Sequence, residues 1–330
     1  MLKRNSVAAV RGRKQAAERL EPAPKPKSAI KPARKKTRQA DVRITHPERI
    51  VFPGTGYTKQ HVADYYRAVM PWMLPELAER PLSLLRCPSG AGSACFFQKH
   101  NTGTLGGDVR SISIREKDGA SDSYLYIDTE RGVLELVQMN ALEFHPWGAR
   151  VDNPERPDRL VFDLDPAPGI DWKTLKAAAL EVREHLGKVG LESFVRLSGG
   201  KGMHVVAPIR RGPSWDEAKA FCEALAGAMA TLKPARYLAT ASKAKRQGRI
   251  FIDWLRNARG ATSVASWSLR AREGAPVSMP LRWEELAKVS GPAAFDLAAA
   301  MKRAKSLRKD PWEGFAELRQ SLPKLGSARR

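Results

Sequence analysis

The sequence contains no apolar run of the roughly 18 to 20 residues needed to cross a bilayer, and its N-terminus shows no apolar segment of the kind that directs secretion. It has three cysteines, Cys87, Cys95 and Cys222, with neither a CxxC pair nor Cys and His at zinc-finger spacing. These absences argue against a membrane protein and a zinc finger. We therefore expect a cytoplasmic protein with reduced, mostly packed thiols, located on the nucleoid if it binds DNA.

Acidic residues are also scarce, since 57 Lys and Arg face 35 Asp and Glu, a net charge of +22. Such a surplus favours a polyanionic partner such as nucleic acid over a neutral small molecule. Half of it lies in residues 1–40, where a Pro- and Lys-rich stretch with 13 bases and 2 acids cannot bury a core. We predict a disordered basic arm over residues 1–40, either a solvated linker or a non-specific DNA tether, followed by one folded body over 41–330.

Apolar spacing within the body predicts both helices and strands. Thr58 can cap a helix that Pro71 kinks or ends, Asp171 opens a second helix, and Ser214 opens a third with a capping box. Between residues 111 and 139, the short runs SISIRE, YLYID and VLELVQM predict several antiparallel strands. The body is therefore expected to mix helices with antiparallel sheets.

Acidic residues interrupt two apolar strands. In RLVFDLDP, Asp163 and Asp165 share one face, and a rise of about 3.3 Å per residue puts their carboxylates roughly 6 to 7 Å apart, within reach of one divalent ion. Asp253 interrupts a second strand, RIFIDWL. Because like charges so close need a neutralising cation, a shared magnesium or manganese site explains the three acids better than an exposed Asp-Pro turn and a separate Asp–Arg pair, although these alternatives stay open. Such sites in phosphoryl transfer hold two metals.

Between the acidic strands, FVRLSGGKGMHVVAP predicts a hairpin with a glycine-rich turn. Glycines let backbone amides approach an anion, and Ser198, Lys201 and His204 add donors around it. The turn does not match the P-loop pattern, so an ordinary hairpin tip remains the alternative. Farther along, Arg270 could clamp a triphosphate, whereas the basic loop SKAKRQGR, which contains Arg246, is either a solvated face or part of the site.

The motifs together resemble one family. RLVFDLDP, LSGGKGMH and IFIDWLRN, in this order and at these separations, with THPERIVFP, CFFQKH and LEFHPWG, resemble the polymerase domain of bacterial DNA ligase D, a branch of the archaeo-eukaryotic primase superfamily. The similarity runs from about Ile44 to about Trp312. It implies an α+β fold, a primase-like catalytic body with antiparallel β-sheets flanked by helices around a central cleft. It also implies that residues 41–330 form one primase-polymerase catalytic domain.

The resemblance further implies residue roles. The catalytic and metal-binding acids would be Asp163, Asp165 and Asp253, with two ions, manganese or else magnesium. The nucleotide-binding residues would be Ser198, Lys201, His204 and Arg270. The residues that hold the 5′-phosphate of DNA would be His46, Arg49 and Lys59. The family commonly has Asn at the position of His46. Template and base stacking would fall to Phe96, Phe97 and Arg246, and His145 lies in a family motif.

The activity implied by the resemblance is template-directed addition of NTPs or dNTPs that fills gaps and extends DNA ends in non-homologous end joining of double-strand breaks. The partners would be DNA ends and gapped DNA, with Ku and DNA ligase modules as candidates. No ligase or nuclease motif is visible, so we expect those modules on other chains or elsewhere in a longer protein. The rival interpretations are a primase that starts chains de novo, a DxD-type manganese glycosyltransferase and a non-catalytic DNA-end-bridging module.

Overall fold

The computed structural model describes residues 42–101, 103, 105–116 and 118–323. The arm predicted over residues 1–40 lies outside the described residues. The described part after that arm belongs to one compact unit. None of its helices is long and apolar enough to cross a membrane.

A six-stranded sheet carries the acidic strands. Its order is β11-β12-β8-β10-β9-β13, and every neighbouring pair is antiparallel except the parallel pair β11 and β12. Its strands are β8 (Arg159–Pro166), β9 (Phe194–Leu197), β10 (Met203–Pro208), β11 (Tyr237–Leu238), β12 (Ile250–Asp253) and β13 (Pro280–Leu281). The predicted acidic strands are therefore β8 and β12, which are direct neighbours, and the predicted hairpin is β9 with β10.

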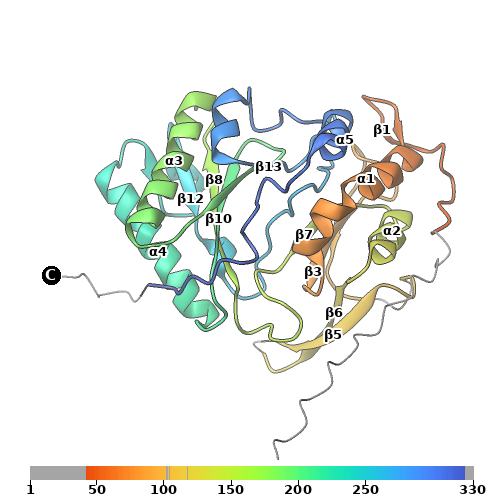
Figure 1. The fold of residues 1–330 in the computed structure, drawn as a ribbon, viewed down its shortest axis with the longest axis horizontal. Coiled ribbons are helices and arrows are strands. Elements are labelled where there is room, and N and C mark those ends of the chain that lie inside the picture. Colours follow the sequence, from red (N-terminus) through yellow and green to blue (C-terminus); the bar gives the residue numbers. More distant parts are fainter. Residues whose placement is uncertain (1–41, 102, 104, 117, 324–330) are drawn as a thin grey trace, which may run out of the picture. The chain divides into compact units, whose positions relative to one another are not determined.

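Two helices cover one face of this sheet, as Figure 1 shows: α3 (Trp172–Lys188) and α4 (Trp215–Leu232). Alternation along β8 explains this, because Leu160, Phe162 and Leu164 are fully buried and leave the acids for the other face. The predicted helix starts are confirmed. Asp171 accepts a hydrogen bond from the Thr174 amide, and Ser214 caps α4 in the expected box.

The smaller sheets and the remaining α-helices form the other side of this unit (Figure 1). A three-stranded sheet has the order β4-β3-β7, and β1 pairs with β2 and β5 with β6. These strands are β1 (Ile50–Phe52), β2 (Tyr57–Thr58), β3 (Leu82–Arg86), β4 (Phe96–Gln98), β5 (Arg110–Arg115), β6 (Ser121–Tyr126) and β7 (Ala141–Pro146). The α-helices are α1 (Lys59–Leu77), α2 (Glu130–Gln138) and α5 (Leu297–Ser306), and the 3₁₀ turns are η1 (Lys243–Lys245), η2 (Leu255–Asn257) and η3 (Trp283–Lys288).

One predicted strand is a helix. VLELVQM belongs to α2, whose first turn is capped by Thr129 through the Gly132 amide. Val133, Leu136 and Val137 lie at helical spacing and are buried with Leu134, but so short an apolar run is also compatible with a strand. Pro71 also does not end α1, which continues to Leu77.

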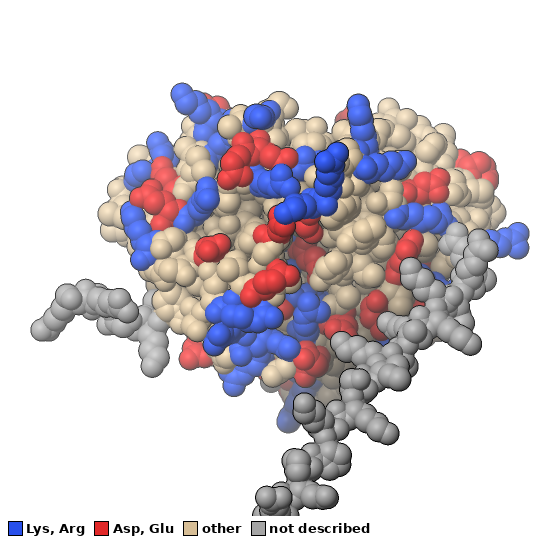
Figure 2. Space-filling model, in the orientation of Figure 1, with Lys and Arg blue, Asp and Glu red and all other residues tan. Residues whose placement is uncertain are grey.

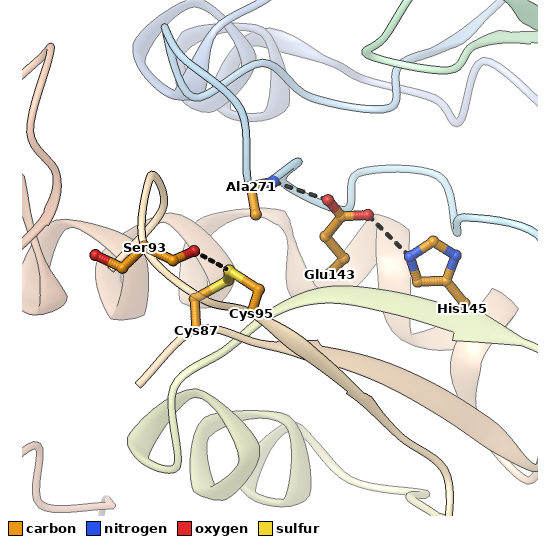
Figure 3. Close-up of a disulfide and its surroundings, with 6 residues drawn as sticks. All are labelled: Cys87, Ser93, Cys95, Glu143, His145 and Ala271. Atoms are coloured by element: carbon orange, nitrogen blue, oxygen red, sulfur yellow. Dashed lines mark hydrogen bonds and ion pairs between the residues drawn. A yellow bond between two sulfur atoms is a disulfide. The ribbon is translucent and has the colours of Figure 1, made fainter. Parts of the chain in front are cut away.

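The expectation of three reduced thiols is wrong for two of them. Cys87 and Cys95 form a disulfide with Cα atoms 4.4 Å apart (Figure 3), whereas Cys222 is free and buried as predicted. The reason is the pairing of β3 with β4, in which Arg86 lies opposite Phe96. The cysteines directly flank that pair, and the sequence spacing alone does not reveal the hairpin.

Candidate active site

A transverse row of polar side chains crosses four neighbouring strands of the large sheet. Asp253 on β12 pairs with Asp163 on β8, Asp163 with His204 on β10, and His204 with Arg196 on β9. Directly opposite residues of antiparallel strands point to the same face. Asp165 lies two residues along β8 and so shares that face. The structure thus brings the three predicted acids together.

The three acids and the four predicted nucleotide-binding residues line one cavity of about 200 Å³. His145, Arg256 and Arg272 line it as well. In the part of the chain that the structure describes, a larger cavity of about 860 Å³ includes Trp72 and Trp312 but none of the predicted site residues. The smaller cavity is therefore the candidate active site.

Basic side chains bridge the three acids. Arg256 Nε lies 3.2 Å from Asp163 Oδ2 and 3.3 Å from Asp253 Oδ2. Asp165 pairs with Lys201, whose Nζ is 3.0 Å away, and with Arg246. No group of three His, Cys, Asp or Glu among the described residues is arranged as a ready metal site. The acids thus hold protein cations in the place where a metal is predicted.

The electrostatics of the acids fit a divalent cation. Burial raises the pKa of Asp163 to about 6, and Asp253 and Asp165 add to this although Arg256 opposes it. Burial likewise raises the pKa of Asp253. The site is therefore short of positive charge even with Arg256 in place, and carboxylate oxygens are the ligands that Mg²⁺ and Mn²⁺ prefer. The Arg256 side chain is 41% exposed and has room to withdraw.

The glycine-rich turn is organised by Ser198. Its Oγ accepts hydrogen bonds of 3.2 Å from the amides of both Gly200 and Gly202. Gly202 passes so close to β8 that an added Cβ would lie 2.3 Å from the Leu164 carbonyl oxygen, which requires glycine there. Lys201, between the two, is the exposed base that reaches Asp165. The turn therefore lies directly against the acids.

His204 is held in one tautomer. Its Nδ1 accepts a 3.1 Å hydrogen bond from Arg196 Nε, and arginine can only donate, so the proton is on Nε2. That Nε2 lies 3.4 Å from Asp163 Oδ1. Burial, followed by the charge of Arg196, lowers the pKa of His204 well below its usual value. His204 is therefore a neutral N–H donor beside the acids. Arg196 is in turn fixed by Glu76 at 2.6 Å.

The predicted stacking residues separate into two places. Phe96 and Phe97 on β4 are 47% and 62% exposed, which is unusual for such large apolar side chains. The Phe97 ring contacts that of His145, with centroids 5.5 Å apart. Arg246 instead pairs with Asp165 and lies over the Phe251 ring. The structure therefore groups Arg246 with the acids.

The predicted 5′-phosphate residues lie together around the β1–β2 hairpin. The Lys59 amide donates to the Arg49 carbonyl, and the Arg49 amide to the His46 carbonyl. Burial and then the charge of Arg49 lower the pKa of Lys59 to about 8. His46 has φ of 52°, the left-handed region that Asn and His adopt more readily than most residues. Lys59 is buried and Arg49 beside it is half-buried, and two clustered cations of this kind are suited to an anion.

Residues 58–312 match the family model described as the LigD primase-polymerase domain. The chain belongs to this family. It is 40% identical over 288 residues to the multifunctional non-homologous end joining protein LigD of Pseudomonas aeruginosa, covering 86% of this chain and 34% of that protein. It is 28% identical over 265 residues to the bifunctional non-homologous end joining protein LigD of Bacillus subtilis, covering 80% of this chain and 42% of that protein.

Among solved structures, the chain is similar to the polymerase domain of Mycobacterium tuberculosis ligase D in complex with DNA, with a TM-score of 0.78 and 30% identity over 84% of this chain and 99% of that one. The resemblance and the fold class predicted from the sequence are thereby confirmed. The chain spans only about a third of the length of its Pseudomonas relative.

Three residues in or beside this candidate site were given no role by the sequence interpretation. Arg256 stands three positions after Asp253 inside the quoted motif IFIDWLRN, without an assigned role. Arg196 and Glu143 are charged residues in the apolar strands β9 and β7, and both are buried. The signal that identified the aspartates, a charge within an apolar strand, could have found these two as well.

Proposed function

We propose that this domain is a template-directed nucleotidyltransferase that fills gaps and extends DNA ends in non-homologous end joining. The observation that carries the proposal is the row of Asp253, Asp163 and His204 across three adjacent strands, in the cavity that also contains Arg270. Membership in the LigD primase-polymerase family supports it, as do relatives named for end joining and a structural relative bound to DNA. Residues 41–330 would be the catalytic domain and residues 1–40 a basic arm.

Two Mn²⁺ or Mg²⁺ ions are the proposed cofactors. Asp163, Asp165 and Asp253 would hold them once Arg256, Arg246 and Lys201 move aside, and the identity and number of the ions belong to the proposal. When bound, such ions activate a primer hydroxyl and neutralise charge on the transferred phosphorus.

The chain's own residues would place the nucleotide. Arg270 and the Nε2–H of His204 donate from fixed positions, and Lys201 and the Ser198 turn, which contacts Arg270, add further donors to the cavity. Fixed donors need no rearrangement as charge develops on the phosphates, so placement and charge compensation account for the catalysis.

DNA would be held outside this cavity. Arg49, Lys59 and His46 would grip the 5′-phosphate at the far side of a gap, and Phe96 and Phe97 would stack on template bases. The proposed partners are DNA ends, gapped DNA, NTPs or dNTPs, and Ku and DNA ligase modules. Such substrates would place the protein on chromosomal DNA in the cytoplasm.

The decisive test is extension of a primer across gapped, 5′-phosphorylated DNA, with labelled NTPs and dNTPs, with and without manganese. We expect Asp253→Asn to reduce extension by about 10²-fold or more while DNA binding is kept, because the transition-state charge loses its compensation. Asp152→Asn, at a surface pair with Arg211, is the matched control and should behave as wild type.

Retained extension by Asp253→Asn would contradict the assignment. Two further measurements distinguish this function from the alternative functions. Synthesis on single-stranded template without a primer would favour a de novo primase, and tight binding of DNA ends by wild type without any turnover would favour a bridging module.

A further inference from the structure

Glu143 on β7 is a buried acid to which the proposed reaction gives no role. Its side chain is only 4% exposed, and it accepts three hydrogen bonds: from Arg270 Nε at 2.9 Å, from the Ala271 amide at 2.8 Å and from His145 Nε2 at 2.9 Å. Burial alone raises the pKa of Glu143, but the hydrogen bond from His145 and the charge of Arg270 outweigh it and lower the pKa to about 2. Glu143 is therefore a fixed anion beside the cavity.

The first two hydrogen bonds fix Arg270. The Glu143 carboxylate accepts a hydrogen bond from Arg270 Nε, and the Ser198 carbonyl accepts one of 2.5 Å from Arg270 Nη1. The planar guanidinium is therefore held at two of its edges. The Ala271 amide pins the adjoining backbone to the same carboxylate, which Figure 3 shows. The orientation of Arg270 in the cavity is thus set by Glu143 and the glycine-rich turn.

The third hydrogen bond fixes His145. Because an ionised carboxylate can only accept, the His145 proton is on Nε2, and the ring is oriented by Glu143 (Figure 3). Leu85 on β3 pairs with Phe97 on one side and Glu143 on the other, so these three residues form a row on one face of the small sheet. The His145 ring meets the exposed Phe97 ring edge-on.

We propose that Glu143 is the positioning residue that aligns the two ends of the substrate site. Through Arg270 it sets the group that meets the triphosphate, and through His145 it supports Phe97, which meets the template base. The inference rests on the proposed function, because those two contacts belong to it. It adds that one buried carboxylate couples nucleotide placement to template placement.

Only a carboxylate can do this at position 143. Glutamine has the same shape, but its single oxygen cannot serve all three donors, and its NH₂ group cannot accept from His145. In Glu143→Gln, Arg270 therefore loses its buried ionic partner, and whichever way the amide is turned, its NH₂ group faces at least one of the three donors. A glutamine at this position thus changes two measurable properties without removing atoms from the core.

The experiment compares Glu143→Gln with Glu285→Gln. Glu285 is a matched control because it also accepts from one arginine, Arg303 at 2.8 Å, and from one backbone amide, that of Arg282 at 2.8 Å, but belongs to η3 and not to the cavity lining. We expect Glu143→Gln to raise the nucleotide KM on primed, gapped DNA about tenfold, the usual cost of weakening a charged hydrogen-bond partner. Glu285→Gln should leave KM unchanged.

The second readout is the tautomer of His145, from ¹⁵N-resolved NMR of the metal-free protein, with the resonance assigned through His145→Gln. Wild type should show the proton on Nε2, and Glu143→Gln should change the ¹⁵N shifts of the ring, because a neutral amide replaces the carboxylate that accepts from it. This measurement does not depend on catalysis, so it tests the contact between Glu143 and His145 even if wild type fails to extend DNA and the proposed function falls. In wild type, it tests that contact even if the variant does not fold.

Two results would overturn the inference. One is a wild-type His145 with its proton on Nδ1, which is incompatible with donation to Glu143. The other is a folded Glu143→Gln protein whose nucleotide KM equals that of wild type and of Glu285→Gln.

Discussion

The pKa values of Asp163 and Glu143 are shifted in opposite directions, although burial alone would raise both. The pKa of Asp163 is raised to about 6 because burial is reinforced by two neighbouring aspartates. The pKa of Glu143 is lowered to about 2 because His145 and Arg270 overcome the same burial. The difference separates an acid group that still requires a cation from one whose charge is already compensated, which is why metal binding is proposed for the first and positioning for the second.

Lys59 gives a pH prediction at this scale. Its pKa of about 8 lies below the ordinary lysine value, so its positive charge is present at pH 7 and is largely lost by pH 9. We expect the preference for a 5′-phosphorylated over a 5′-hydroxyl gap to fall about tenfold between pH 7 and pH 9, measured as a ratio of gap-filling rates at subsaturating DNA. Lys59→Arg keeps its charge at both values and should show a nearly flat ratio. A wild-type ratio constant over this range would contradict the role of Lys59.

Secondary-structure elements were predictable where their periodicity was clear. β8 alternates between buried apolar residues and acids, so both its strand character and the shared face of Asp163 and Asp165 follow from the sequence. α2 was misassigned because its apolar run is short and rich in Val and Leu, so periodicity alone does not distinguish a strand from a helix. The contacts of Glu143 with Arg270 and of Arg256 with Asp163 join residues distant in sequence, which spacing does not specify.

The Cys87–Cys95 disulfide gives a prediction for the β3–β4 hairpin. The cysteines are separated by 8 positions, and closing so short a loop reduces the entropy of the unfolded chain by an amount that stabilises the fold by roughly 2 to 3 kcal/mol. Cys87→Ser/Cys95→Ser should therefore lower the free energy of unfolding in urea by about that amount. Dithiothreitol should lower it in wild type and in the control Cys222→Ala but leave the double variant unchanged. Wild type that is insensitive to dithiothreitol would show that the bridge is absent in solution.

The whole molecule carries a net charge of +22, and its distribution decides what that charge does. On the face shown in Figure 2, Lys and Arg are spread among Asp and Glu, and both gather around a hollow near the middle. The folded body thus combines its surplus of bases with many local ion pairs, whereas residues 1–40 hold 13 bases and 2 acids. A segment with so few acids leaves most of its charge for a polyanion.

Non-specific DNA binding should therefore depend on salt chiefly through residues 1–40. Each phosphate neutralised contributes about −0.9 to the slope of log K against log salt, so a chain beginning at residue 41 should bind random duplex more weakly and with a slope less steep by several units. A full-length variant with the Lys and Arg of residues 1–40 replaced by Gln separates charge from length and should match the truncated chain. Gap filling at saturating DNA should be unchanged in both, because Asp163, Asp253 and Arg270 belong to the body. Equal slopes for all three proteins, measured by fluorescence anisotropy from 50 to 200 mM salt, would show that the body alone supplies the phosphate contacts.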